Sequence, residues 1–200
     1  MRNAPVREIK LGKQILRIFP DESPESPRSW DNLGTMVCSH KRYNLGDKHD
    51  FDFNQYDGWE EAGKALIKEN DAAIVLRLYL FDHSGISLRT TPFSDRWDSG
   101  QVGFVFISKE KLRKEYGVKR ISKKLLEKVE KYLIGEVGTY DQYLRGDVFG
   151  FEVVEVSTCD KEHEHEEHID SCWGFFGNDF SENGIADHLS KEFAEALKAA

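Results

Sequence analysis

The sequence predicts an α+β fold: a mainly antiparallel sheet of about five to seven strands, with three or four helices packed against it. Short segments rich in β-branched and aromatic residues, bounded by Gly, Pro and Asp, recur along the chain. Between them lie segments whose apolar residues recur at helical spacing. The most apolar stretch, residues 73–107, predicts three consecutive strands at the centre of the sheet.

The composition predicts one domain over residues 1–200, with an irregular excursion at about 20–57. Hydrophobic residues make up 39% of the chain and aromatic residues 12%, which is enough to build a packed core. The three cysteines, Cys38, Cys159 and Cys172, are odd in number and widely spaced, so we expect a reducing compartment. No apolar run reaches the roughly 18 residues of a membrane-spanning helix, and we therefore expect a cytoplasmic protein.

The first third of the chain predicts few regular elements. Strands are expected at 14–19 and 36–38, and the proline-rich, acidic segment 20–27 is expected as a loop. A helix is expected at 59–70, because acidic residues open it, a lysine lies near its end and its apolar residues share one face.

The central strands are expected at 74–81, 86–91 and 102–107. Gly85 supplies the positive φ that the first turn needs, and Pro92 ends the second strand. Because the three strands follow one another directly, an antiparallel meander is the simplest topology.

Two helices are expected next. Ser108 caps the first, which ends at Gly117, and Ser122 caps a longer one. Gly135 and Gly138 predict a kink or a break in that longer helix. The remaining expected elements are strands at 148–156 and 169–176 and a last helix at 185–198.

Polar side chains crowd around the turns of the central strands: Asp82, His83, Ser84, Asp95, Asp98 and Ser99. Adjacent residues at a strand end point to opposite sides, so Asp82, His83 and Ser84 cannot form a catalytic triad among themselves. Two interpretations remain open. Either these side chains bond local backbone amides in the turns, or Asp82, His83, Asp95 and Asp98 are candidate catalytic residues.

The link at 157–168 is acidic and rich in histidine. His and Cys are preferred ligands of zinc, and the candidate ligands in and beside this link are Cys159, His163, His165, His168 and Cys172. On an extended segment His163 and His165 project to the same side, and His168 could reach round to join them. No C-x2-C spacing is present, and the interleaved glutamates equally predict a solvated acidic loop that needs no metal.

Charge is unevenly distributed along the chain, whose formal net charge is -8. Residues 109–131 hold ten Lys or Arg and four Glu, whereas residues 152–187 hold eleven acids and one Lys. Both segments fit either interaction surfaces or ordinary solvated faces. The negative total disfavours a non-specific DNA-binding protein, and no glycine-rich phosphate loop is present.

Several strings in the sequence are specific enough to compare with known proteins. They are DHSG at 82–85, PFS at 92–94, WDSGQVG at 97–103, TYDQYL at 139–144, GD at 146–147 and DSCWGF at 170–175. On these strings the second half of the chain resembles a group of uncharacterised proteins encoded by bacteriophages and other mobile elements. No activity is attached to that group, so the resemblance implies no catalytic role.

The resemblance implies a cytoplasmic accessory protein that binds a host protein or protein complex in a bacterial cell. Inhibitors of CRISPR or restriction defence are the obvious class, some of them with acidic surfaces that mimic DNA. The binding residues expected on this interpretation are Trp97, Glu162, Glu164, Glu166, Glu167 and Asp170. Direct nucleic-acid binding, membrane association and a required cofactor are not expected.

The alternative is a small hydrolase or nuclease, metal-dependent in one version. It would use Asp82, His83, Asp95 and Asp98, because functional sites often form where polar groups gather at the ends of apolar strands.

Overall fold

The computed structural model describes residues 4–95, 97–158 and 163–199. Within these residues the chain forms four α-helices and eight β-strands, and neighbouring strands are antiparallel. The predicted α+β class is confirmed. The strands do not form one sheet of five to seven, however, but two sheets of four strands each.

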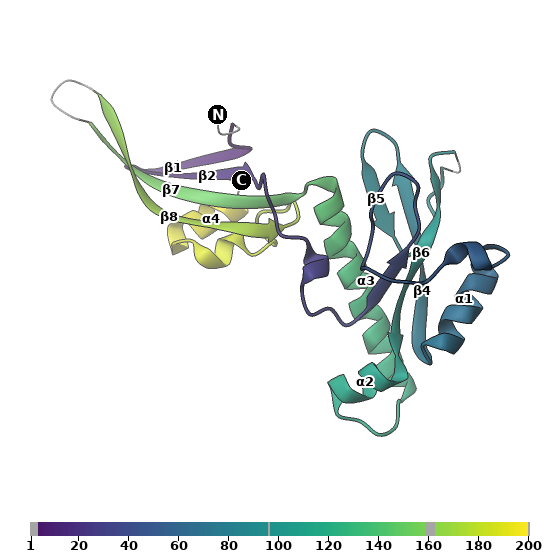
Figure 1. The fold of residues 1–200 in the computed structure, drawn as a ribbon. Helices are drawn as coiled ribbons and strands as arrows, with labels where there is room; N and C mark the ends of the chain where they lie inside the picture. Colours follow the sequence, from purple (N-terminus) through teal and green to yellow (C-terminus); the bar gives the residue numbers. More distant parts are fainter. Residues whose placement is uncertain (1–3, 96, 159–162, 200) are drawn as a thin grey trace. The chain divides into compact units, whose positions relative to one another are not determined.

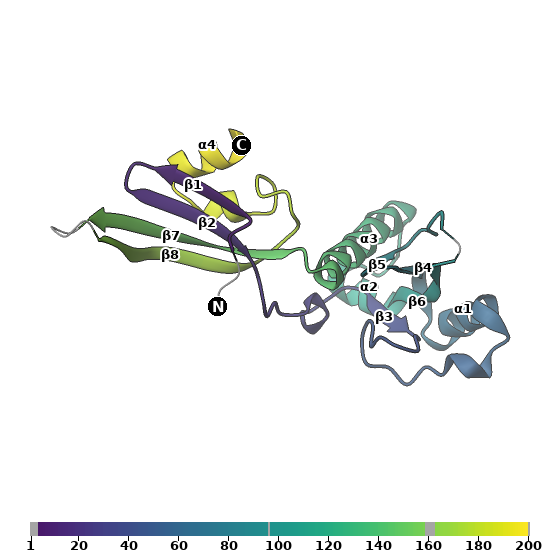
Figure 2. The same cartoon turned by 90° about the horizontal axis from the view of Figure 1, so that it is seen from above.

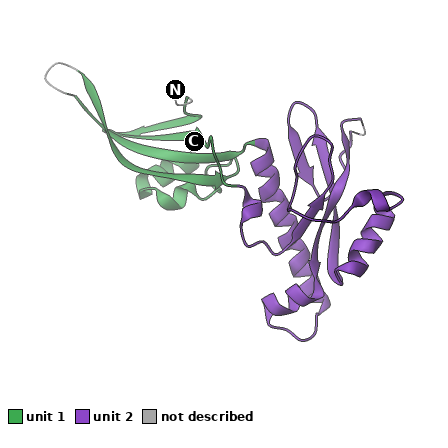
Figure 3. Ribbon diagram, viewed as in Figure 1, with its two compact units in different colours: residues 1–25, 146–200 green, residues 26–145 purple. Residues whose placement is uncertain are grey.

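Contacts divide the chain into two compact units, where the sequence predicts a single domain (Figure 3). Unit 1 combines Met1–Glu25 with Gly146–Ala200, and unit 2 is the continuous segment Ser26–Arg145. Each unit has its own sheet and its own buried apolar clusters. The strands of unit 1 come from the two ends of the chain, and such long-range pairing leaves no mark in a local residue pattern.

Unit 1 contains a sheet with the strand order β1-β2-β7-β8 (Figure 2). The strands span Arg7–Leu11 (β1), Gln14–Pro20 (β2), Val148–Thr158 (β7) and Glu164–Phe176 (β8). Strands β2 and β7 match the expected positions. No strand is expected at β1, because charged residues occupy three of its five positions.

The C-terminal segment covers one face of this sheet. Its elements are the 3-10 helix η3 (Ile185–His188) and helix α4 (Lys191–Ala199). Phe193 of α4 is fully buried in a cluster with Phe151 of β7. The sequence predicts one helix at 185–198, whereas the structure has two shorter helices separated by Leu189 and Ser190. The Ser190 hydroxyl accepts a hydrogen bond from the Phe193 N–H at 3.4 Å, which caps the start of α4.

Strand β8 is longer than the sequence predicts. The acidic link at 157–168 is expected as a loop, yet the residues described there from Glu164 onward pair with β7, with Glu164 opposite Thr158. The side chains of residues 164–170 are all exposed. Pairing with β7 satisfies backbone amides while the charged side chains stay in water, so an acidic composition does not exclude a strand.

Unit 2 contains a sheet with the strand order β3-β6-β4-β5. The strands span Thr35–Cys38 (β3), Ala72–Asp82 (β4), Ile86–Arg89 (β5) and Ser99–Ser108 (β6). The expected meander is wrong, because β5 and β6 both pair with β4, which lies between them. The link at 90–98 carries the chain from one edge of β4 to the other.

Helices cover both faces of this sheet (Figure 1). They are α1 (Gly58–Glu69), α2 (Lys109–Tyr116) and α3 (Lys123–Arg145). Alternate residues of β6 face the two layers: Val105 and Ile107 pack in the cluster with α3, whereas Phe104 and Phe106 pack in the cluster with α1. This alternation is the period of two that a strand imposes on its side chains.

Helix α3 runs without interruption through Gly135 and Gly138, where the sequence predicts a kink or a break. Its buried stripe, which includes Val129, Leu133 and Val137, stays in one register against the sheet. Tertiary packing thus outweighs the weak helical propensity of the two glycines. Within the described ranges, no helix has both the length and the apolar character needed to span a membrane.

The excursion at 20–57 is held in place by a buried arginine. The Arg28 guanidinium donates to both carboxylate oxygens of Asp47, at 2.8 and 2.7 Å, and to the carbonyl of Gly34 at 2.8 Å. Glu136 of α3 accepts hydrogen bonds from the backbone N–H groups of Leu33 and Gly34, at 2.6 and 2.9 Å. These bonds tie the excursion to the rest of unit 2.

Candidate functional site

The ends of β4, β5 and β6 meet at one end of the unit 2 sheet and carry the predicted polar residues. The backbone N–H of Asp82 donates to the carbonyl of Asp98 at 2.8 Å, which joins the two loops. The turn after β4 has positive φ at Ser84 (55°) and at Gly85 (147°), as the glycine leads us to expect.

Phe93 anchors the second loop. Its ring packs on Phe81 with the centroids 5.5 Å apart, and the Arg89 guanidinium lies 3.7 Å from its centroid. Arg89 also donates to the carbonyls of Thr91 and Pro92, at 2.9 and 2.6 Å. The PFS string therefore has a structural role, because it holds the backbone that leads to the site residues.

Asp95 has the role that turn chemistry predicts. Its carboxylate accepts hydrogen bonds from the backbone N–H groups of Trp97 at 2.7 Å and Asp98 at 3.2 Å. These bonds favour the charged form and lower the pKa of Asp95. The Ser99 hydroxyl donates to the Asp95 carbonyl. Since Asp95 and Ser99 already bond the loop backbone, they shape the loop.

His83 and Asp98 form a pair, with His83 Nδ1 and Asp98 Oδ2 3.0 Å apart. Asp82 has other partners. Its carboxylate accepts a hydrogen bond from the Tyr43 hydroxyl at 3.0 Å and forms an ion pair with the Arg42 guanidinium. The bond to a carboxylate raises the pKa of Tyr43. Asp82 and His83 are neighbours in sequence but belong to two separate polar pairs.

A pocket of about 300 Å³ opens beside these pairs. Its lining includes His40, Arg42, Asp82, Asp98 and Trp97. The Trp97 side chain is 97% exposed, so this large apolar group stands in water at the pocket. We call Arg42, Asp82, His83, Trp97 and Asp98 the loop site.

The loop site offers one pair suited to acid–base chemistry. Asp98 holds Nδ1 of His83, which leaves Nε2 to exchange a proton, and His83 is 64% exposed on its side chain. Among the described residues, no serine or cysteine side chain hydrogen-bonds to His83. The arrangement thus resembles a general base that would act on water or on a substrate, without a protein nucleophile of the Ser-His-Asp kind.

The predicted zinc ligands do not converge. Along β8, His165 and Glu167 lie on one face and Glu166 and His168 on the other, so His168 does not join His165. Cys172 packs on the apolar cluster of unit 1. In the part of the chain that the structure describes, no three His, Cys, Asp or Glu residues form a group that could hold a metal ion. Cys159 lies outside the described residues.

The predicted acidic residues that the structure describes on β8 are exposed, with Glu166 on one face of the sheet and Glu167 on the other. Glu164, Glu166, Glu167 and Asp170 are all exposed on the strand, and we call them the acidic ribbon. Glu166 is paired through both carboxylate oxygens with Arg17 of β2, at 2.5 and 2.7 Å. Glu162 lies outside the described residues.

Sequence reasoning missed Arg42 of the loop site and its neighbours His40 and Tyr43. They come from the excursion, whose pattern follows neither the helical nor the strand period. His40 and Tyr43 stack with their ring centroids 5.1 Å apart, and Arg42 and Tyr43 both reach Asp82. A cluster of aromatic and basic residues in a loop was the only signal, and it is too common to identify a site.

Comparison with known proteins found no match to a family model, to a curated protein or to a solved structure.

Proposed function

We propose that this chain is a binding protein that docks on a host protein or protein complex through the loop site. The observation that carries the proposal is Trp97, which is 97% exposed beside a polar pocket. Tryptophan is over-represented among the residues that dominate interface energetics, where polar neighbours surround an aromatic anchor. Arg42, Asp82 and Asp98 supply such polar neighbours.

The acidic ribbon supports the same proposal. Host defence complexes bind nucleic acid, so they present basic surfaces that an acidic protein can approach quickly and occupy. Glu164, Glu167 and Asp170 supply exposed carboxylates for that role, whereas Glu166 is already paired with Arg17. Together with the resemblance to phage-encoded proteins, this makes inhibition of a CRISPR or restriction complex the form of action that we propose.

The test is a phage plating assay in bacteria that carry a CRISPR or restriction system. We expect expression of the chain to raise plating efficiency, and Trp97→Ala to remove most of that effect because the aromatic anchor is lost. The matched control is Ile67→Ala, another exposed apolar residue of unit 2, which lies on α1. Equal plating with and without the chain, across several defence systems, would count against the proposal.

A second candidate function is a small hydrolase or nuclease, favoured by the His83–Asp98 pair at 3.0 Å. Here His83 would take a proton from water while Asp98 orients the ring. We expect His83→Ala to abolish hydrolysis of a phosphodiester or ester substrate, and Asp98→Asn to reduce it strongly. Assays with and without added divalent metal separate the two versions of this function.

The variants Trp97→Ala and His83→Ala distinguish the two candidate functions. If the chain binds, Trp97→Ala removes most of the protection, whereas His83→Ala leaves most of it because His83 does not line the pocket beside Trp97. If the chain is an enzyme, His83→Ala abolishes both hydrolysis and protection, and hydrolysis is detected in the purified protein.

A further inference from the structure

A basic groove lies at the other end of the unit 2 sheet from the loop site. In the pairing of β4 with β6, Phe81 is opposite Ser99 at the loop-site end, and Ala72 is opposite Ser108 at the far end. Helix α2 starts directly after Ser108. Helix α2 lies at the end of the sheet away from the turn between β4 and β5 (Figure 1), and the residues that line the groove, at 122–131, follow it in the chain.

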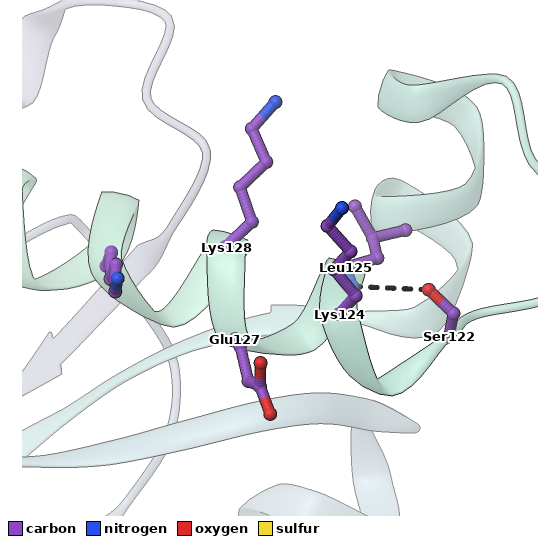
Figure 4. A pocket seen from close by; sticks show the side chains of 6 residues that line it. Ser122, Lys124, Leu125, Glu127 and Lys128 are labelled. Atoms are coloured by element: carbon purple, nitrogen blue, oxygen red, sulfur yellow. Dashed lines mark hydrogen bonds between the residues drawn. The ribbon is translucent and has the colours of Figure 1, made fainter.

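Three lysines line this groove along one face of α3. Lys124, Lys128 and Lys131 follow the i, i+4, i+7 spacing that places side chains on the same side of a helix. They span about 10 Å along the helix axis. The groove has a volume of about 520 Å³, and Ser122, Leu125 and Glu127 complete its lining (Figure 4).

The lysines of the groove are not neutralised by neighbouring carboxylates. Glu127 points away from Lys128 and lies 3.9 Å from Lys123 (Figure 4). Within the described ranges, no carboxylate forms an ion pair with Lys124, Lys128 or Lys131. With Glu127 in its lining, the groove carries a net positive charge of two, and three unpaired ammonium groups face a ligand.

Two tyrosine rings lie next to Lys128 of the groove. The Lys128 ammonium lies 5.4 Å from the ring centroid of Tyr116 and 5.5 Å from that of Tyr132. This position between two aromatic faces holds the Lys128 side chain near the groove. Tyr132 is 51% exposed, so part of its ring is free to contact a ligand.

Charge within the chain is divided between the units. Unit 2 contains 20 Lys or Arg and 18 Asp or Glu, whereas unit 1 contains 8 and 18. The net negative charge of the chain therefore belongs to unit 1, and it does not exclude a polyanion from the groove of unit 2.

We propose that this groove binds the phosphodiester backbone of a single-stranded nucleic acid. A polymer with regularly spaced negative charges can meet all three lysines at once, which a small anion cannot. An exposed aromatic ring beside a basic groove favours a single strand over a duplex, because its bases are free to stack on the ring. The inference goes beyond the binding of a host protein at the loop site.

The test is fluorescence anisotropy of the full chain with a labelled oligothymidylate of about 20 nucleotides. We expect binding at low salt, with log affinity falling against log salt at a slope of about -2, as three phosphate contacts on a single strand predict. Lys124→Gln, Lys128→Gln and Lys131→Gln together should weaken binding at least about tenfold and flatten that slope. Tyr132→Ala should weaken it about tenfold.

The control replaces three exposed lysines elsewhere in unit 2, Lys48, Lys64 and Lys68, with Gln. It removes the same charge, and we expect less than about a twofold change in oligonucleotide affinity.

An equal loss of affinity in this control, absence of binding at low salt, or equal binding of a duplex would overturn the proposal. Equally effective competition by polyglutamate would indicate an acidic protein partner instead. Trp97→Ala should leave oligonucleotide binding unchanged, which separates this test from that of the loop site.

Discussion

At the scale of single residues, Arg28 is a buried charge in unit 2, with only 6% of its side chain exposed. Its two hydrogen bonds to Asp47 compensate the loss of water around a charged group. Asp47 also accepts a hydrogen bond from the backbone N–H of Met36 at 2.9 Å, so the pair fixes both ends of the excursion's middle part to β3, which lies within it. The segment that carries Arg42 and Tyr43 to the loop site depends on this link.

We predict that Asp47→Ala lowers the free energy of unfolding of unit 2 by about 3 kcal/mol, because it removes both hydrogen bonds that a buried charge donates to Asp47 and leaves the longer ion pair with Glu136, at 3.9 Å, in their place. Urea denaturation followed by circular dichroism measures the change. The control is Glu60→Ala, which breaks an exposed ion pair with Lys64 and should cost less than about 0.5 kcal/mol. Equal stability of the two variants would contradict the prediction.

At the scale of elements, local pattern located most strands and helices but not their partners. Strands such as β2 and β6 are short runs rich in β-branched and aromatic residues, and α1 carries apolar residues at helical spacing, so neighbouring residues are enough to locate them. Strand β1 alternates exposed charged residues with half-buried ones, and the acidic part of β8 is exposed and charged. Pairing with β2 and β7 stabilises these two segments. Composition alone therefore did not predict β1 or the acidic part of β8.

Arg17 links the acidic ribbon to β2, and this link is sensitive to pH. The side-chain hydrogen bond from Arg17 lowers the pKa of Glu166 below its ordinary value of 4.5. The folded protein therefore binds this proton less readily than the unfolded chain does. This contribution to stability is complete above pH 4.5 and is lost as the pH falls through the lowered pKa.

We therefore predict that the urea midpoint of unit 1 falls as the pH drops below 4.5, and that Glu166→Gln makes the fall shallower. Glu167→Gln, on the other face of the same strand, should keep the pH profile of the original chain. If the urea midpoint varies with pH in the same way for Glu166→Gln and for the original chain, the ion pair between Glu166 and Arg17 does not contribute to the pH dependence of stability.

At the scale of the whole molecule, the two units differ in how they are built. Unit 2 is one continuous segment with apolar clusters on both faces of its sheet. Unit 1 needs both ends of the chain, because β2 and β7 pair directly. The loop site and the basic groove both belong to unit 2, whereas the acidic ribbon belongs to unit 1.

We predict that the fragment Ser26–Arg145 folds on its own, because about 120 residues with a complete core is within the range of independent domains. Dispersed amide signals in an NMR spectrum and one cooperative urea transition would support this. The fragment should also keep the oligonucleotide binding of the full chain. An unfolded fragment would show that unit 2 depends on unit 1.

By itself, the sequence determined the α+β class, the antiparallel character of the strands and the position of most elements, since each depends on residues close together in the chain. It also located the polar turns of the loop site. Only the tertiary structure decided which strands share a sheet and which residues complete the site. Arg42 reaches Asp82 across 40 positions of sequence, and contacts over such distances follow from the packing of the whole unit.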